Sequence, residues 1–281
     1  MKILVTGVKG QLGYDVMKVL HERKIDCVGT DIDNFDITDF EAASNFITNY
    51  HPDVVIHCSA YTAVDKAEDN LELCIAVNVE GPRNIAKVCQ TIDAKMVYIS
   101  TDYVFPGTGD HIYEVNDVTG PLGAYGETKL DGELAVKEQL VKYFIVRISW
   151  VFGKNGHNFI KTMLQLGKTH DEVNVVCDQI GSPTYTADLA LLLCDMVMTE
   201  KYGTYHASNE GFCSWAEFAV EIFKQAGYTT KVNSIPSSKY PTRAKRPLNS
   251  RMNKKSLDEA SFKRLPAWQD ALKRYLKEIE A

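Results

Sequence analysis

The 281-residue sequence predicts an α/β fold with a Rossmann-type, doubly wound parallel sheet and a smaller C-terminal lobe. Three observations support this prediction. Apolar runs alternate with helical stretches through the first half of the chain, and a glycine-rich turn joins the first run to the first helix. Runs such as 3–5 and 54–56 are apolar on both faces, as expected for parallel strands that lie between two helix layers.

The first 150 residues follow a repeating strand–helix pattern. Crossovers of this length join parallel strands with a right-handed sense, so the pattern predicts one sheet of roughly six strands. The expected strands are 2–6, 26–30, 53–58, 96–100 and 144–149, and the expected helices are 11–23, 40–50, a long segment through Asn78 and Ile85, and 125–142.

After residue 150 the pattern becomes less regular. Helices are expected near 158–166, 186–198, 214–226 and 268–279, with a strand near 173–176. We therefore expect residues 1–150 to form one domain and residues 151–281 to form mainly a smaller lobe, with some segments returning to the main sheet. This lobe is expected to bind the substrate and to close over the carboxyl edge of the sheet, where open α/β sheets bind ligands.

Composition excludes several classes of protein. A formal charge of −6 argues against general nucleic-acid binding, although residues 236–255 hold seven cationic side chains and no acidic one. This basic segment could attract a small anionic ligand. The most apolar window, 187–198, contains Asp188 and Asp195 and is too short to cross a bilayer, and the N-terminus resembles a strand rather than a signal peptide. We expect a cytoplasmic chain with no membrane contact and with its seven cysteines reduced.

Residues 6–13 read T-G-V-K-G-Q-L-G and connect the first strand to the first helix. Glycine allows a tight turn and a close backbone approach, and the start of a helix offers free N–H groups to a pyrophosphate. This context predicts a dinucleotide-binding loop, and residues 1–150 are therefore expected to be a dinucleotide-binding domain. The predicted cofactor contacts of the loop are Gly7, Gly10, Gln11, Leu12 and Gly13.

Asp31 follows the second strand, where a carboxylate can accept hydrogen bonds from the adenosine ribose. Its charge favours NADH, whereas Lys9 in the glycine loop could partly accept the 2′-phosphate of NADPH. Both cofactors therefore remain open. Asp36 and Ile37 are expected to border the adenine.

Tyr125 and Lys129 are four residues apart, which places a phenol and an ammonium on one helix face. A phenol has a reference pKa near 10, so a neighbouring Lys⁺ and an oxidised nicotinamide are expected to lower the pKa of Tyr125. The pair follows a strand that ends in Ser100, Thr101 and Asp102. Glycine loop, strand end and Tyr/Lys pair come in the order needed for carbonyl reduction.

These residues resemble an extended short-chain dehydrogenase/reductase, and within that superfamily the dTDP-4-dehydrorhamnose reductase family. The glycine loop and the Tyr/Lys pair are typical of the superfamily as a whole, whereas other segments are more specific. The more specific segments are S-A-Y-T-A-V-D-K at 59–66, S-T-D-Y-V-F at 100–105, R-I-S-W at 147–150, D-Q-I-G-S-P-T at 178–184 and R-P at 246–247.

The resemblance implies reduction of the 4-keto group of dTDP-4-dehydro-β-L-rhamnose by NADH or NADPH, giving dTDP-L-rhamnose. It implies that Tyr125 donates a proton to the developing alkoxide, that Thr101 hydrogen-bonds that oxygen, and that Lys129 holds the nicotinamide ribose. It further places Ala60, Tyr61 and Thr62 beside the cofactor, and Val64, Asp102, Tyr103 and Trp150 around the sugar. Arg246 is expected to neutralise the diphosphate, in a loop that orders on substrate binding.

Two further expectations follow from the resemblance. Asn78 is expected to support the active site through backbone or water contacts. No catalytic metal is expected. Some relatives bind magnesium at a dimer contact, and Asp15 is the one candidate ligand for such an ion, so the chain is expected to be a monomer or a homodimer.

Two alternative functions remain open. The first is a nucleotide-sugar epimerase or dehydratase on the same scaffold, which would use bound NAD internally. Against it, Asp102 and Tyr103 stand where a dehydratase carries an Asp-Glu or Glu-Lys pair. The second is a non-catalytic module that resembles the regulatory subunit of methionine adenosyltransferase, and the presence of Thr101, Tyr125 and Lys129 favours catalysis instead.

Overall fold

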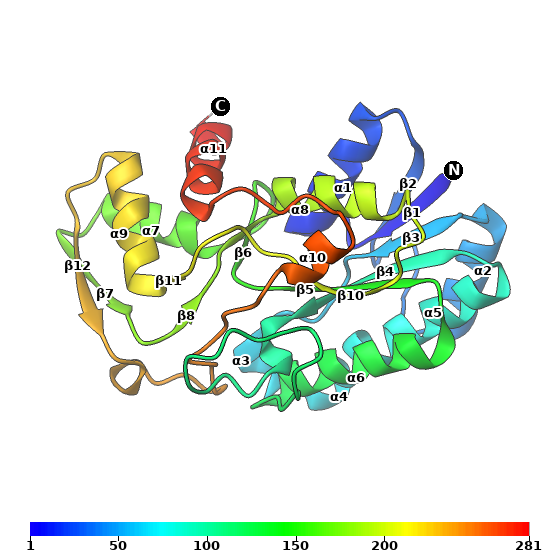
Figure 1. The fold of residues 1–281 in the computed structure, drawn as a ribbon, viewed down its shortest axis with the longest axis horizontal. Helices are drawn as coiled ribbons and strands as arrows, with labels where there is room; N and C mark the ends of the chain where they lie inside the picture. Colours follow the sequence, from blue (N-terminus) through cyan, green and yellow to red (C-terminus); the bar gives the residue numbers. More distant parts are fainter. Residues whose placement is uncertain (281) are drawn as a thin grey trace.

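The computed structural model describes residues 1–280. Its centre is a six-stranded parallel sheet with the order β10-β5-β4-β3-β1-β2 (Figure 1). The strands are β1 (Lys2–Thr6), β2 (Asp26–Thr30), β3 (Val54–His57), β4 (Lys95–Thr101), β5 (Tyr143–Ile148) and β10 (Gly203–His206). The doubly wound parallel sheet predicted from the sequence is confirmed.

The sixth strand does not come from the first 150 residues, which supply only five. β10 pairs with β5 from Gly203↔Phe144 to His206↔Arg147. Its sequence, G-T-Y-H, contains no apolar run, so the hydrophobic pattern did not predict it. Residues beyond 150 therefore complete the main sheet.

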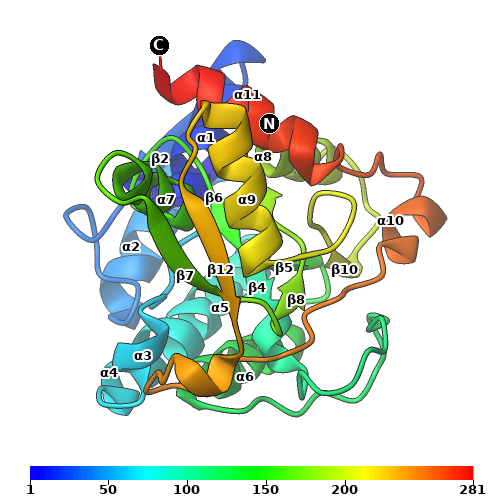
Figure 2. The same ribbon diagram turned by 90° about the vertical axis from the view of Figure 1, so that its left-hand side faces the viewer.

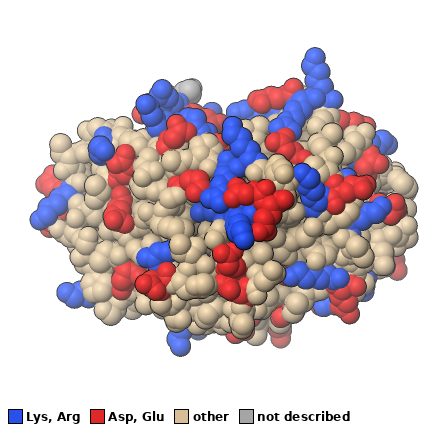
Figure 3. All heavy atoms as spheres, in the orientation of Figure 1, with Lys and Arg blue, Asp and Glu red and all other residues tan. Residues whose placement is uncertain are grey.

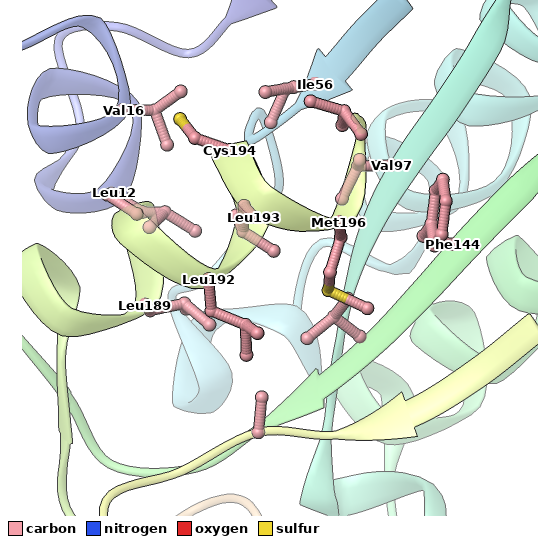
Figure 4. Packing of buried hydrophobic residues seen from close by; sticks show 14 of the residues in the cluster. Leu12, Val16, Ile56, Val97, Phe144, Leu189, Leu192, Leu193, Cys194 and Met196 are labelled. Atoms are coloured by element: carbon pink, nitrogen blue, oxygen red, sulfur yellow. The ribbon is translucent and has the colours of Figure 1, made fainter. Parts of the chain in front are cut away.

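Helices cover both faces of the sheet (Figure 1). One face packs against α1 (Gln11–Glu22) and α8 (Thr186–Met196), and the other packs against α2 (Phe40–Tyr50), α5 (Gly81–Thr91) and α6 (Ala124–Gln139). Alternate residues of each strand serve the two faces: Ile3 and Val5 contact the first layer and Leu4 the second. Figure 4 shows the first layer, in which Leu12 and Val16 of α1 and Leu193 of α8 lie over Ile56 and Val97.

The long helix predicted through Asn78 and Ile85 is divided into three parts. α4 (Leu71–Ile75) continues as a π-helical turn, η1 (Ala76–Glu80), and then as α5. An extra residue in a helical turn re-aims the side chains around it. Asn78 lies in this turn and is buried. The short helix α3 (Val64–Ala67) precedes it.

The remaining elements form a second layer of structure beside the sheet. β7 (Glu172–Val176) and β12 (Lys231–Ile235) pair in parallel, and Figure 2 shows them next to α9 (Trp215–Ala226). With α7 (Phe159–Gly167) and α11 (Trp268–Glu280) they enclose a separate apolar cluster around Phe152, Phe218 and Tyr275. The short elements are β6 (Val151–Phe152), β8 (Ile180–Gly181), β9 (Thr184–Tyr185), β11 (Cys213–Ser214), η2 (Asp102–Val104), η3 (Ser237–Lys239) and α10 (Lys255–Glu259).

Charges of both signs are mixed over the face shown in Figure 3. Within the basic segment, Lys255 pairs with Glu259 of its own helix, while Arg243 and Arg246 pair with carboxylates next to and on α3. Three of the seven positive charges of this segment are therefore paired with carboxylates of the same chain. Within residues 1–280, no helix has the length and apolar character that a bilayer span requires.

Candidate active site

A cleft of about 790 Å³ opens at the carboxyl ends of the strands. The cleft lies beyond the ends of the neighbouring strands β1 and β3, where the strand order of the sheet reverses. Doubly wound sheets bind ligands at this position. The cleft brings together every cofactor and substrate residue predicted from the sequence except Arg246. These lining residues are Gly7, Gly10, Gln11, Leu12, Gly13, Asp31, Asp36, Ile37, Ala60, Tyr61, Thr62, Val64, Thr101, Asp102, Tyr103, Tyr125, Lys129 and Trp150.

The glycine loop has a shape that side chains would obstruct. Gly7 has a φ of +72°, and a Cβ at this position would lie 2.7 Å from the backbone nitrogen of Ser59. A Cβ on Gly13 would overlap the carbonyl oxygen of Gly7. Among residues 1–280 no side chain caps α1 at Gly10, and the first turn of α1 carries no acidic residue. The N-terminal N–H groups of α1 therefore face the cleft free for an anion, which fits a dinucleotide pyrophosphate.

Asp31 is held by the backbone on both of its carboxylate oxygens. The Lys9 N–H donates to Oδ2 at 3.0 Å and the Ile32 N–H donates to Oδ1 at 2.9 Å. The Lys9 ammonium pairs with Asp33, and its hydrogen bond to Asp33 raises the pKa of Lys9. A carboxylate held by the backbone and an exposed ammonium thus lie side by side at this end of the cleft.

Tyr125 and Lys129 lie on the first turns of α6 and both face the cleft. The ring of Tyr125 packs edge-on against Tyr103, with ring centroids 5.4 Å apart, and Thr101 lines the same cleft. The Lys129 ammonium is 2% exposed and lies 4.0 Å from the centre of the Tyr98 ring. The α6 helix therefore places both groups against the end of β4.

Burial dominates the proton affinities of this pair. It raises the pKa of Tyr125 well above the ordinary value of a phenol, and it lowers the pKa of Lys129 to about 7. From the Tyr125/Lys129 spacing, Lys129 was expected to lower the pKa of Tyr125. In the chain alone the loss of solvation outweighs that effect, so Tyr125 stays protonated at neutral pH.

Thr101 ends β4 and caps the 3₁₀ turn η2. Its hydroxyl accepts the Tyr103 N–H at 3.2 Å and donates to Asp102 Oδ1 at 3.0 Å. Asp102 is only 3% exposed, and burial raises its pKa to about 6. Its second oxygen, Oδ2, is buried without a hydrogen-bond partner in the part of the chain the structure describes.

Asn78 makes the backbone contacts expected of it. Its Oδ1 accepts the Tyr61 N–H at 2.8 Å, and its Nδ2 donates to the Tyr61 carbonyl at 3.2 Å. The same Nδ2 lies 3.2 Å from the Thr128 hydroxyl of α6. Asn78 therefore connects the loop after β3 to the helix that carries Tyr125 and Lys129.

Trp150 is held in place by two residues that sequence reasoning missed. Its indole stacks on Trp215 with centroids 3.8 Å apart and planes 14° apart. A Cβ at Gly181 would lie 2.8 Å from the same indole, so this position needs glycine. Trp150 itself has a φ of +50°, which is unusual for a large side chain. The D-Q-I-G-S-P-T segment contained the signal for Gly181, whereas Trp215 had none.

Arg246 lies outside the cleft lining. Its Nη2 pairs with Asp65 Oδ2 at 2.6 Å, and its Nη1 donates to the Tyr103 hydroxyl at 3.4 Å. The Ala244 N–H also donates to Asp65, at 3.1 Å. The loop is therefore attached to α3, and Arg246 reaches the cleft through Tyr103. Asp65 was present in the A-Y-T-A-V-D segment, but its role depends on a residue 181 positions away.

Asp15 does not match the expected ligand at a dimer contact. It is 1% exposed and hydrogen-bonded to the Thr186 hydroxyl beneath α8, and burial raises its pKa. A carboxylate in this position is not on a surface that a second chain could reach. Within residues 1–280, no three His, Cys, Asp or Glu side chains are grouped to hold a metal ion.

A protein family and several known proteins are similar to this chain along nearly its whole length. The family model described as "RmlD substrate binding domain" matches residues 1–281. The spore coat polysaccharide biosynthesis protein SpsK of Bacillus subtilis (strain 168) is 37% identical over 277 residues, 99% of this chain and 97% of that protein. The dTDP-4-dehydrorhamnose reductase of Aggregatibacter actinomycetemcomitans is 37% identical over 285 residues, 97% of each chain.

A solved structure shows the same fold. The dTDP-4-dehydrorhamnose reductase of Bacillus anthracis str. Ames, in complex with NADP, is 42% identical, with a TM-score of 0.96 over 99% of each chain. The sequence motifs, the residues that line the cleft and the similarity to these proteins all indicate the same family. On this basis the chain belongs to the RmlD substrate-binding-domain family.

Proposed function

We propose that this chain is an NAD(P)H-dependent reductase that converts dTDP-4-dehydro-β-L-rhamnose to dTDP-L-rhamnose by reducing the 4-keto group. One observation carries the proposal. Thr101, Tyr125 and Lys129 line the same cleft as the glycine loop, so a proton donor lies beside a site that fits a dinucleotide. The names of relatives with 37% and 42% identity indicate the same reaction.

The glycine loop and the start of α1 would hold the pyrophosphate, and Asp31 would accept hydrogen bonds from the adenosine ribose. Lys9 would accept a 2′-phosphate after leaving Asp33, so the site supports either NADH or NADPH. The bound dinucleotide supplies the hydride for C4 of the sugar. Ala60, Tyr61 and Thr62 would form the wall of the site beside the nicotinamide.

Tyr125 would donate its proton to the ketone oxygen as that oxygen gains negative charge. Its raised pKa keeps it protonated before the reaction. Lys129 would bind the nicotinamide ribose, and its ammonium would favour the tyrosinate that remains after proton transfer. Thr101, which lines the same cleft, would hydrogen-bond the same ketone oxygen as it gains negative charge.

The sugar would lie among Val64, Asp102, Tyr103 and Trp150, all of which line the cleft. We also propose that residues 151–281 provide most of the remaining substrate contacts, apart from β10, which belongs to the main sheet, and α8, which packs on it. Arg246 is the candidate partner of the diphosphate, which would have to compete with Asp65 for the guanidinium.

The decisive experiment supplies the 4-keto sugar nucleotide, made in situ, and follows the consumption of NADH or NADPH. Wild type should oxidise one equivalent of cofactor for each ketone reduced, and Tyr125→Phe should lower kcat by about 10²- to 10⁴-fold. Tyr205→Phe is the matched control, because the Tyr205 hydroxyl donates to the Lys201 carbonyl outside the cleft. Equal rates for Tyr125→Phe and wild type would refute the role of Tyr125.

The same assay separates the alternatives. Conversion of the sugar without net cofactor consumption would indicate an epimerase or a dehydratase. No ketone-dependent oxidation of either cofactor, together with stable co-purification with a synthetase, would indicate the regulatory module.

A further inference from the structure

Tyr98 is a buried tyrosine of the central sheet that contacts both ends of Lys129. Tyr98 and Val97 are neighbours on β4, so the side chain of Val97 faces the layer of α1 and α8 and that of Tyr98 faces the layer of α6. The Lys129 ammonium lies 4.0 Å from the centre of the Tyr98 ring. The Tyr98 hydroxyl donates to the Lys129 carbonyl at 3.2 Å. One strand residue therefore contacts both the head group and the backbone of this lysine.

The Tyr98 hydroxyl reaches the backbone of α6 because residue 132 is a glycine. A Cβ at Gly132 would overlap both the Tyr98 hydroxyl and the Asn78 carbonyl. The same hydroxyl lies 3.4 Å from that carbonyl. Glycine is unfavourable in the middle of a helix, so a close approach is a physical reason for its presence here. A side chain at position 132 would push the tyrosine, and its ring, away from Lys129.

The Tyr98 ring attracts the Lys129 ammonium without competing for all of its hydrogen-bond donors. Among residues 1–280, no carboxylate and no hydrogen-bond acceptor pairs with this ammonium; Glu133, one turn further along α6, pairs with Arg147 and Lys137 instead. A carboxylate would compete with a ligand for the N–H groups, whereas a ring attracts the cation through its face. The N–H groups that point away from the ring therefore stay available to a ligand in the cleft that Lys129 lines.

We infer that Tyr98 is a positioning residue for the proposed reduction: its ring holds the Lys129 ammonium at the wall of the cleft, where the nicotinamide ribose would bind. This inference rests on the proposed function, in which Lys129 binds that ribose. It gives a role in cofactor binding to a buried residue that lies outside both the sequence motifs and the lining of the cleft.

The surroundings of the Tyr98 ring keep it in place. The ring is 0% exposed, and the imidazole of His57 on β3 lies nearly parallel to it, with centroids 6.1 Å apart and planes 17° apart. His57 is itself held by a hydrogen bond of 2.8 Å between its Nδ1 and the hydroxyl of Thr6. Burial lowers the pKa of His57 to about 3, so this imidazole is neutral at neutral pH and does not compete as a cation for the ring.

The first test is a double-mutant cycle in which fluorescence titration measures the dissociation constant of NADH or NADPH. Tyr98→Leu should weaken binding about tenfold when Lys129 is present, and it should have little effect in a Lys129→Met background. Titrations at about pH 6 keep the amine protonated, because burial lowers the pKa of Lys129 only to about 7. Losses that add in the double variant overturn the inference, because a tyrosine that only packs the core acts in the same way whatever residue 129 is.

A second test changes the ring and leaves the packing intact. Tyr98→Phe keeps the ring and should bind the cofactor nearly as tightly as wild type, although it loses the hydroxyl. Phenylalanines with increasing numbers of ring fluorines withdraw electron density from the ring face, so the affinity should fall with each fluorine. A constant affinity along this series overturns the inference, including the case in which Tyr98→Leu does not fold. A loss for Tyr98→Phe as large as that for Tyr98→Leu assigns the effect to the hydroxyl and also overturns it.

Tyr202→Leu is the matched control, because the Lys95 ammonium lies 6.0 Å from the centre of the Tyr202 ring, outside the cleft lining. It should leave the dissociation constant unchanged, and a loss as large as that of Tyr98→Leu would overturn the inference. If wild type binds neither cofactor, the proposed function fails and this inference fails with it. Wild type that binds the cofactor and reduces the ketone, but gives additive losses in the cycle, removes the inference alone.

Discussion

The ion pair between Glu133 and Arg147 fixes the helix that carries Tyr125 and Lys129. Arg147 Nε and Nη2 each donate to one oxygen of Glu133 at 2.8 Å, and the Ser100 hydroxyl donates to Oε1 at 2.6 Å. The two charged side chains are 0% and 3% exposed. Glu133→Gln keeps the shape but leaves the guanidinium buried without a counter-charge. Removing one partner of such a pair costs about 3–5 kcal/mol.

Urea unfolding of Glu133→Gln at neutral pH measures this loss. We expect a lower midpoint with an unchanged slope, since the surface exposed on unfolding stays the same. The matched control is Glu138→Gln on the same helix, which removes an exposed ion pair to Arg83 with a 3.1 Å separation. Because solvent screens that pair, its loss should cost less than about 1 kcal/mol.

The pH dependence of the difference gives an independent check. Burial pushes the pKa of Glu133 upward, but the hydrogen bonds and charge of Arg147 hold it below its ordinary value of 4.5. The carboxylate therefore stabilises the fold above about pH 4.5, and this contribution is lost as the pH falls toward the folded-state pKa. A cost for Glu133→Gln below about 1 kcal/mol at neutral pH would refute the reasoning.

Three further predictions concern the cleft and its surroundings. Gly13→Ala should weaken cofactor binding at least about tenfold, as measured by fluorescence titration. Gly120→Ala is the control, because a Cβ at Gly120 meets only ordinary contacts and should leave the affinity unchanged. Equal affinities for the two variants would contradict the proposal that the glycine loop holds the cofactor. Gly181→Ala should displace the Trp150 indole and diminish the near-ultraviolet circular dichroism of its stacked pair, and an unchanged spectrum would contradict this. Burial lowers the pKa of His206 to about 3, so the buried neutral imidazole stabilises the fold above about pH 6.5 and progressively less as the pH falls. The Tm of His206→Gln should therefore fall less steeply between about pH 6.5 and pH 4 than the Tm of wild type. Equal slopes for the two proteins would refute this prediction.

Local sequence pattern was enough to predict the parts of this protein that depend on neighbouring residues. The apolar runs predicted five of the six strands of the sheet, because burial on both faces leaves a signal within each strand. The glycine loop and the Tyr125/Lys129 spacing were visible for the same reason. The glycine loop, Tyr125 and Lys129 all line the cleft, because the carboxyl ends of parallel strands lie close together at one edge of the sheet.

Contacts between segments far apart in the sequence could not be predicted from local pattern. The strand β10 needs only a free edge of β5 to pair with, and its own sequence carries no such information. Asp65 meets Arg246, and Gly181 meets Trp150, after the chain has folded back on itself. The burial of Asp15 and Asp102 also depends on what covers them. Burial raises the pKa of both carboxyls, and solvent exclusion is a property of the assembled interior that no single stretch of residues encodes.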